Sequence, residues 1–222
     1  MSMPLRAVQF GEFNTADDWG LILHEKNITP PKAKTNYVSV PGRDGDLDLT
    51  EALSGVVNYQ DRIGTFSFIL ADGKHDDRER LISEIVGALN GQSLRYIDLD
   101  DYPEHYMIGR FSVLDVMNIN AYGTMTVEAT FSPWRYSLRE TTVRQSVSSD
   151  GEIPVIISNR GYKTVTPIVT VTGSVTLLFG SSAVTLTDGT YTVPGLLFAP
   201  GVTTIGAAGF GSVEIVFTEA VF

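Results

Sequence analysis

Cysteine is absent from the 222 residues of this chain. A chain without thiols forms no disulfides, thiolate zinc sites or iron–sulfur clusters, and it has no cysteine nucleophile. Long apolar runs are also missing, because no stretch approaches the roughly 18 consecutive apolar residues that indicate a membrane-spanning helix. Met1 leads into a polar, strand-like segment without the apolar region of a secretory signal. We therefore expect no membrane insertion and a product that begins in the cytosol.

Positive charge is scarce. The chain has 16 Lys and Arg against 26 Asp and Glu, with a net charge of −10 and a pI near 4.7. Affinity for phosphates comes from clustered cations, so this balance opposes non-specific binding to nucleic acid. The apolar fraction of 43% and the mean hydropathy of +0.06 are those of a globular protein. The length favours two domains, or one large all-β domain.

Motifs that carry chemistry are few. The three histidines, His24, His75 and His105, are far apart and match no metal-ligand spacing. No Gly-x-Ser-x-Gly elbow or phosphate-binding glycine pattern occurs, and Gly206, Gly209 and the nearby Gly211 are better explained as a turn or bulge. We therefore predict no catalytic residue, no metal site and no cofactor.

The densest acidic cluster follows a strand-like run. It consists of Asp98, Asp100, Asp101 and Glu104. Carboxylates at such spacing could bind calcium or act as acid and base, but Pro103 interrupts and the glycine and glutamate of an EF-hand loop are missing. A solvated turn between two strands explains the cluster more simply.

Charge is distributed unevenly along the chain. Eight charged residues lie in 141–222, and all the others lie in the first 140. The polar run 145–151 adds turn-forming residues to this change in composition. We therefore predict two domains, 1–140 and 141–222.

The first domain is predicted to be β-rich with a single helix. Leu81, Ile82, Ile85, Val86 and Leu89 recur with helical spacing, and Asn90-Gly91 ends the pattern, which predicts a helix over 75–90. Runs rich in β-branched and aromatic residues predict strands around it. They are 5–10, 37–40, 64–70, 94–99, 105–116 and 125–131.

The second domain is predicted to be almost purely β. Its short runs of Val, Ile, Thr and Phe are 153–157, 166–171, 174–179, 183–187, 189–193 and 212–218. Thr172-Gly173 and Gly180-Ser181 separate some of these runs, and Asp188-Gly189 is the strongest hairpin signal. Strands at this spacing indicate a β-sandwich or barrel.

The loop Pro41-Gly42-Arg43-Asp44-Gly45 has the composition of a tight turn. Proline fixes φ, glycine permits positive φ, and apolar residues alternate on both sides, so the segment is predicted to connect two strands. A turn alone would explain these residues without any function.

Several ordered motifs resemble the distal tail protein (Dit) family of long-tailed phages over about residues 1–140. These motifs are Asp18-Trp19-Gly20-Leu21, the segment 34–45, Leu47-Asp48-Leu49-Thr50-Glu51-Ala52-Leu53, the segment 96–103, Tyr106-Met107-Ile108-Gly109-Arg110-Phe111 and the segment 129–136. The resemblance implies an N-terminal split β-barrel with one α-helix and a C-terminal galectin-like β-sandwich. It also implies a structural role without enzymatic activity.

The same resemblance implies an assembly. Six copies would form a ring at the distal end of the tail, in a virion assembled in the host cytoplasm. The ring would join the tail tube protein to the tail-associated hub protein, and receptor-binding or adhesin proteins could attach outside. DNA would pass through the centre without specific binding, which suits an acidic protein. In this setting Pro41, Gly42, Arg43, Asp44 and Gly45 become a candidate oligomer-interface loop, in which Arg43 could pair with an acid of a neighbouring copy.

Two other classes remain open. A hydrolase would need two carboxylates at a fixed separation, which sequence does not measure. A carbohydrate-binding adhesin module for host cell-wall polysaccharide would need an aromatic platform, and the second domain contains no Trp, so we expect it to dock protein rather than bind sugar. Phe179 and Phe217 are predicted to point into the core. The candidate sugar-facing or partner-facing aromatics are Tyr162, Tyr191, Phe198 and Phe210.

Overall fold

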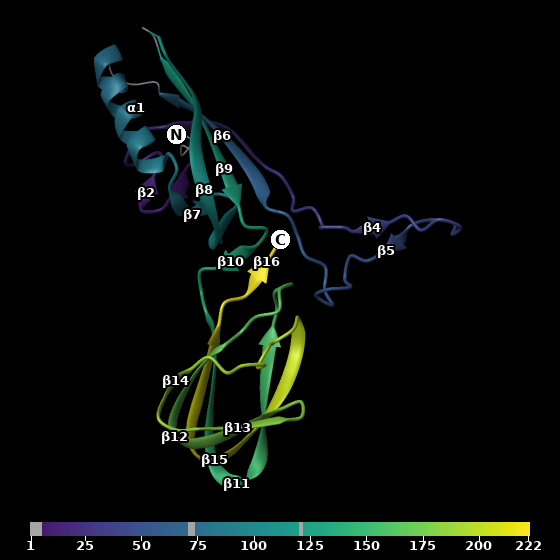
Figure 1. The fold of residues 1–222 in the computed structure, drawn as a ribbon. Helices are drawn as coiled ribbons and strands as arrows, with labels where there is room; N and C mark the ends of the chain where they lie inside the picture. The colour runs from purple at the N-terminus through teal and green to yellow at the C-terminus, as the bar shows by residue number, and fades with distance from the viewer. Residues whose placement is uncertain (1–5, 71–73, 120–121) are drawn as a thin grey trace. The chain divides into compact units, whose positions relative to one another are not determined.

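The computed structural model describes residues 6–70, 74–119 and 122–222, and it divides into two compact units (Figure 1). The first unit runs to Arg135 and also includes Phe222. The second unit is Tyr136–Val221. The chain therefore leaves the first unit once and returns to it with its last residue.

The first unit is built on one antiparallel sheet. Its main path has the order β2-β1-β7-β8-β9-β6-β3. The strands are β1 (Val8–Phe10), β2 (Phe13–Asn14), β3 (Ile22–Ile28), β6 (Arg62–Leu70), β7 (Ser93–Asp98), β8 (Tyr102–Asn118) and β9 (Gly123–Phe131). Strand β3 was not predicted, because its polar residues His24, Glu25 and Lys26 break the alternation that marks a strand.

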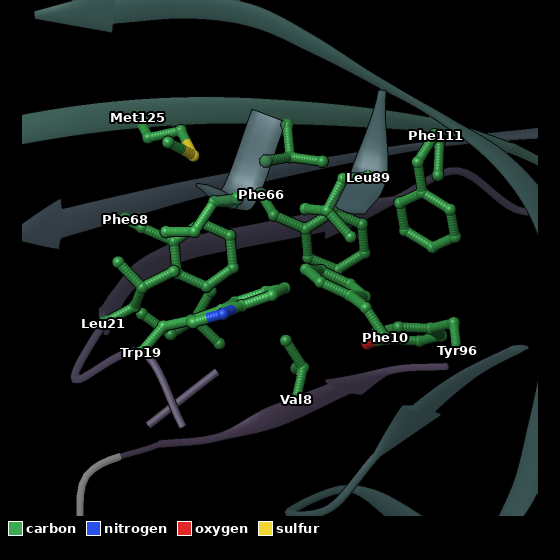
Figure 2. Packing of buried hydrophobic residues seen from close by; sticks show 14 of the residues in the cluster. Val8, Phe10, Trp19, Leu21, Phe66, Phe68, Leu89, Tyr96, Phe111 and Met125 are labelled. Atoms are coloured by element: carbon green, nitrogen blue, oxygen red, sulfur yellow. The ribbon is translucent and has the colours of Figure 1, made fainter. Parts of the chain in front are cut away.

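The sheet curls around an aromatic core. Along β6 and β9 every second residue is buried, as expected for strands with one covered face. Phe66 of β6 and Tyr96 of β7 are not on neighbouring strands, yet their ring centroids are 5.1 Å apart. Figure 2 shows Phe10 and Tyr96 lying among the other rings of this core. The sheet therefore closes on itself like a split barrel.

One helix covers part of this core. Helix α1 (His75–Leu89) confirms the predicted helix, and Ile82, Ile85 and Leu89 are its buried apolar residues. Asp76 and Asp77 lie in the first turn, where the helix dipole favours negative charge. The helix ends before Gly91, whose φ of +76° is a conformation that glycine adopts easily. No helix among the described residues is long and apolar enough to span a membrane.

The second unit is a five-stranded antiparallel sheet. Its order is β11-β15-β12-β13, and β14 also pairs with β12. The strands are β11 (Thr141–Asn159), β12 (Ile168–Phe179), β13 (Ser182–Leu186), β14 (Gly189–Tyr191) and β15 (Gly201–Phe217). Two short strands, β10 (Arg135–Ser137) and β16 (Ala220–Val221), pair with each other. The predicted mainly β class with one helix is confirmed for the described residues.

Three local predictions for the second unit were wrong because long-range pairing overrides turn propensity. The polar run 145–151 lies inside β11, where residues 145–149 pair with β15. Thr172-Gly173 is an internal part of β12, and Gly173 lies opposite Gly211. Asp188-Gly189 forms no hairpin between its flanking strands, since β13 and β14 each pair with a different part of β12.

Glycines allow the long strands to approach closely. A Cβ on Gly173 would lie 2.5 Å from the Phe210 carbonyl oxygen, and a Cβ on Gly211 would collide with the Thr172 carbonyl oxygen. Gly209 has a φ of +118°, which other residues rarely adopt. The inner face buries Val147, Val171 and Val213 in a core separate from that of the first unit. Gly206, Gly209 and Gly211 therefore lie within strand β15 and not in a turn.

Candidate assembly surfaces

The first candidate surface is an extended arm, residues 29–61, between β3 and β6. Its two sides are joined by hydrogen bonds from Gln60 N to Lys32 O (2.7 Å) and from Lys34 N to Asn58 O (2.8 Å). Further out, β4 (Tyr37–Val38) pairs with β5 (Leu47–Asp48). In Figure 1 this ribbon extends away from the sheet of the first unit.

The loop 41–45 lies at the end of the arm. It connects β4 to β5, so the predicted inter-strand turn is confirmed. Gly42 and Gly45 have φ values of +83° and +73°. Arg43 N donates to Val40 O at 3.2 Å, whereas no described residue accepts a hydrogen bond from the Arg43 guanidinium. The interface role of this loop stays a prediction.

The arm exposes apolar side chains that have no core to join. Leu53 is fully exposed at 101%, and Tyr37 and Val56 are 58% and 55% exposed. The arm also has a hollow of about 680 Å³, lined by Tyr37, Asp48 and Glu51 among others. Hydrogen bonds from the hydroxyl and backbone of Thr50 lower the pKa of Asp48. Exposed apolar side chains gathered on one segment are typical of a surface that another protein covers.

The base of the arm holds an aromatic cluster that sequence reasoning did not find. Phe222 stacks on Trp134 with centroids 4.5 Å apart and meets the edge of Tyr59 at 4.7 Å. Arg135 Nη1 donates to the Phe222 carbonyl oxygen at 2.8 Å. The three aromatics are separated by long stretches of sequence, so no local pattern connects them.

Two arginines lie near the same base. The Arg62 side chain is buried, and its Nε donates to Pro133 O at 2.9 Å. Burial and the nearby Arg135 charge lower the pKa of Arg62 to about 10. Arg135 lies over the Tyr102 ring, 4.2 Å from its centroid. Both guanidiniums are thus held by backbone oxygens and rings of the first unit.

The acidic cluster at 98–104 is only partly the solvated turn that was predicted. Asp98 is 4% exposed, and its carboxylate pairs with Lys26 of β3 and accepts a hydrogen bond from Tyr96 Oη at 3.3 Å. Lys26 also donates to Asp101 at 2.6 Å, and this bond lowers the pKa of Asp101. The prediction was wrong for Asp98 because the sheet curls and brings β3 to β7.

The pKa values around this cluster follow from the same contacts. Burial and the charge of Asp98 raise the pKa of Tyr96. Burial opposes the charge of Lys26, but the hydrogen bonds to Asp101 and Asp98 outweigh it and raise the pKa of Lys26. Within the described part of the chain no group of three or more His, Asp or Glu residues could hold a metal ion.

The four candidate aromatics of the second unit lie in different environments. Tyr162 and Phe210 are 64% and 60% exposed. Tyr191 is half-buried and packs against the core. Phe198 is fully buried, with its ring 5.6 Å from that of Phe217, so the expectation that it faces a partner or sugar was wrong. Its backbone pairs with Val165, and this bridge turns the side chain inward.

Comparisons with known proteins identify the fold but no sequence relative. No protein-family model and no curated protein sequence matches this chain. Among solved structures, the chain is similar to one described as the SPP1 Dit (gp 19.1) protein, a paradigm of hub adsorption apparatus in Gram-positive infecting phages. The TM-score is 0.71 with 15% sequence identity, over 98% of this chain and 100% of the other. The chain therefore has a Dit-like fold along its whole length.

Proposed function

We propose that this chain is a structural protein of the tail tip of a long-tailed phage, without enzymatic activity. The observation that carries the proposal is the match to the SPP1 Dit structure over essentially the full length of both chains. A match that covers both units and the arm supports a common role more strongly than a shared single domain would. The proposed location is the distal end of the tail in the virion.

The proposed assembly is a ring of six copies. The first unit would form the ring, and the second unit would lie outside it as a docking module for a receptor-binding or adhesin protein. One ring face would meet the tail tube protein and the other the hub protein. The net charge of −10 would let DNA pass through the centre without being held.

The arm supplies a physical reason for ring closure. Its exposed apolar residues and its loop cannot pack on their own unit, so they would be covered by the neighbouring copy. The arm and the surface that receives it are different surfaces, and such a contact forms a closed ring when the rotation between copies closes. Arg43 would contribute by pairing with a carboxylate of the neighbour.

Light scattering of the full chain tests this proposal, first alone and then with the tail tube protein added. We expect about six chains per particle in at least one condition. Leu53→Ser and Arg43→Ala should each reduce assembly without lowering the melting temperature, because both side chains are exposed in the single chain. Leu197→Ser is the matched control, since Leu197 is also exposed, at 53%, but belongs to the second unit. A strict monomer in both conditions, or normal rings with both arm variants, would contradict the proposal.

A further inference from the structure

The outer face of the second unit carries polar residues in register across three strands. Arg144 of β11 lies opposite Glu214 of β15, which lies opposite Thr170 of β12. The next rows along the strands are Ser146–Ser212–Thr172 and Ser148–Phe210–Ser174. The side chains of the middle and last rows are exposed, while Val147, Val171 and Val213, which lie between the rows, belong to the core.

This face is hollowed rather than flat. A depression of about 250 Å³ is lined by residues of all three strands. They are Arg144, Gln145, Ser146, Thr170, Thr172, Ser212, Val213 and Glu214. The volume lies just below the range of about 300–1,000 Å³ typical of small-molecule sites, so it suits a ligand of one or two rings.

The depression offers hydrogen-bonding groups without net charge. Arg144 Nε and Nη2 both donate to Glu214 Oε1, at 2.8 and 2.5 Å, so the guanidinium and carboxylate neutralise each other. The Glu214 Oε2 atom and the hydroxyls of Ser146, Thr172 and Ser212 make no side-chain hydrogen bond to the described residues. Hydroxyl groups and a carboxylate oxygen around one depression, without excess charge, match the hydroxyls of a neutral sugar.

An aromatic side chain lies in the row beside the depression. Phe210 is 60% exposed although its backbone is paired on both sides, with Ser148 and Ser174. The adjacent Gly209 and Gly211 admit no side chain of their own, because a Cβ on either would collide with the β12 backbone. Phe210 is therefore presented to solvent from a rigid position and not from a mobile loop. Its ring can pack against the apolar C–H face of a sugar whose hydroxyls reach the depression.

We propose that this outer face, formed by Phe210 and the Arg144–Glu214 depression, binds a neutral saccharide of one or two rings. The sequence favoured protein docking over sugar binding because the second domain contains no Trp, and it left Phe210 as one of four candidate aromatics. The strand register instead puts Phe210 on the same face as the polar groups. The site does not depend on ring formation, so it goes beyond the proposed structural role.

The test uses the full chain and a defined set of sugars: glucose, galactose, mannose, rhamnose, N-acetylglucosamine, N-acetylgalactosamine and their β-linked disaccharides with glucose. Saturation-transfer-difference NMR with each sugar at millimolar concentration identifies binders, and titration calorimetry then measures the affinity. We expect saturable binding of at least one sugar. Phe210→Ala and Glu214→Gln should each weaken it by at least about tenfold.

The matched control is Tyr162→Ala, which removes an aromatic of similar exposure near the end of β16. It should leave the affinity unchanged, and the melting temperatures of all three variants should stay close to that of the original chain. Failure of every sugar to bind would overturn the proposal, and so would Phe210→Ala and Glu214→Gln variants that bind as tightly as the original chain. Either result would leave the oligomeric state untouched, so the two proposals fail separately.

Discussion

At the scale of single residues, two glycines make the space that Phe131 occupies in the first core. A Cβ on Gly64 would lie 2.5 Å from Phe131 Cε2, and a Cβ on Gly109 would lie 2.8 Å from Phe131 Cε1. Interiors are packed closely, so an added methyl group must displace the ring or the strand. The motif Tyr106–Phe111 therefore contains its glycine for a packing reason.

We expect Gly109→Ala to destabilise the protein by about 1–3 kcal/mol, as overpacking does in other cores. Gly87→Ala is the matched control, because Gly87 is exposed in helix α1 and a Cβ there meets nothing within 4 Å. That substitution should stabilise the helix by up to about 1 kcal/mol. Urea unfolding of both variants tests whether the two changes in the free energy of unfolding have opposite signs. Unchanged stability in Gly109→Ala would show that Phe131 can move aside.

At the scale of elements, the ion pair between Lys26 and Asp98 joins strands that are not neighbours in the sheet. Strand β3 is at one end of the path and β7 is near the other. The ion pair therefore stabilises the curled form of the whole sheet and not the pairing of two neighbouring strands. Lys26 and Asp98 side chains are 16% and 5% exposed, so water screens the pair only weakly.

Lys26→Met should lower the free energy of unfolding at neutral pH by about 3 kcal/mol, because it leaves the Asp98 carboxylate buried without its cation. The pKa of Asp101 is lowered in the folded protein, so its share of the stability is present above pH 3.8 and is lost as the pH falls further. The pKa of Lys26 is raised, so its share is present below pH 10.5 and is lost at higher pH.

Unfolding free energies of the original chain and Lys26→Met, measured between pH 3 and pH 8, check this dependence. The difference between them should shrink at the acidic end. Arg144→Met is the control for an exposed pair, since the Arg144 side chain is 77% exposed, and it should change stability by less than about 1 kcal/mol. A difference that stays constant over the whole pH range would contradict the ion-pair explanation.

At the scale of the whole molecule, the two units have separate cores. Chains with separate cores commonly unfold in more than one step. Both tryptophans, Trp19 and Trp134, belong to the first unit, and the second unit contains none. Tryptophan fluorescence therefore reports on one unit, whereas far-UV circular dichroism reports on both.

We expect Gly211→Ala to lower the melting temperature of the second unit while the fluorescence midpoint stays unchanged. The added Cβ would collide with the Thr172 backbone, and neither strand can move without breaking its pairing. Circular dichroism should then show two separated transitions. Gly109→Ala should instead shift the fluorescence midpoint and leave the melting temperature of the second unit unchanged. If both signals move together in both variants, the units unfold as one.

Local sequence determined those features whose causes lie within about a dozen residues. The spacing from Leu81 to Leu89 predicted helix α1, alternation predicted β6 and β9, and Pro41–Gly45 predicted the turn between β4 and β5. These patterns are reliable because helical faces, strand faces and turns each depend on neighbouring residues.

Tertiary structure decided the features that depend on which distant strands meet. Pairing with β15 kept the turn-like run 145–151 extended, and pairing with Val165 placed Phe198 in the core. The curl of the first sheet buried Asp98, and strand register brought Phe210 beside the polar rows of the second unit. Local sequence does not encode these outcomes, because each depends on contacts between residues far apart in the chain, and those contacts can outweigh a local preference of about 1 kcal/mol.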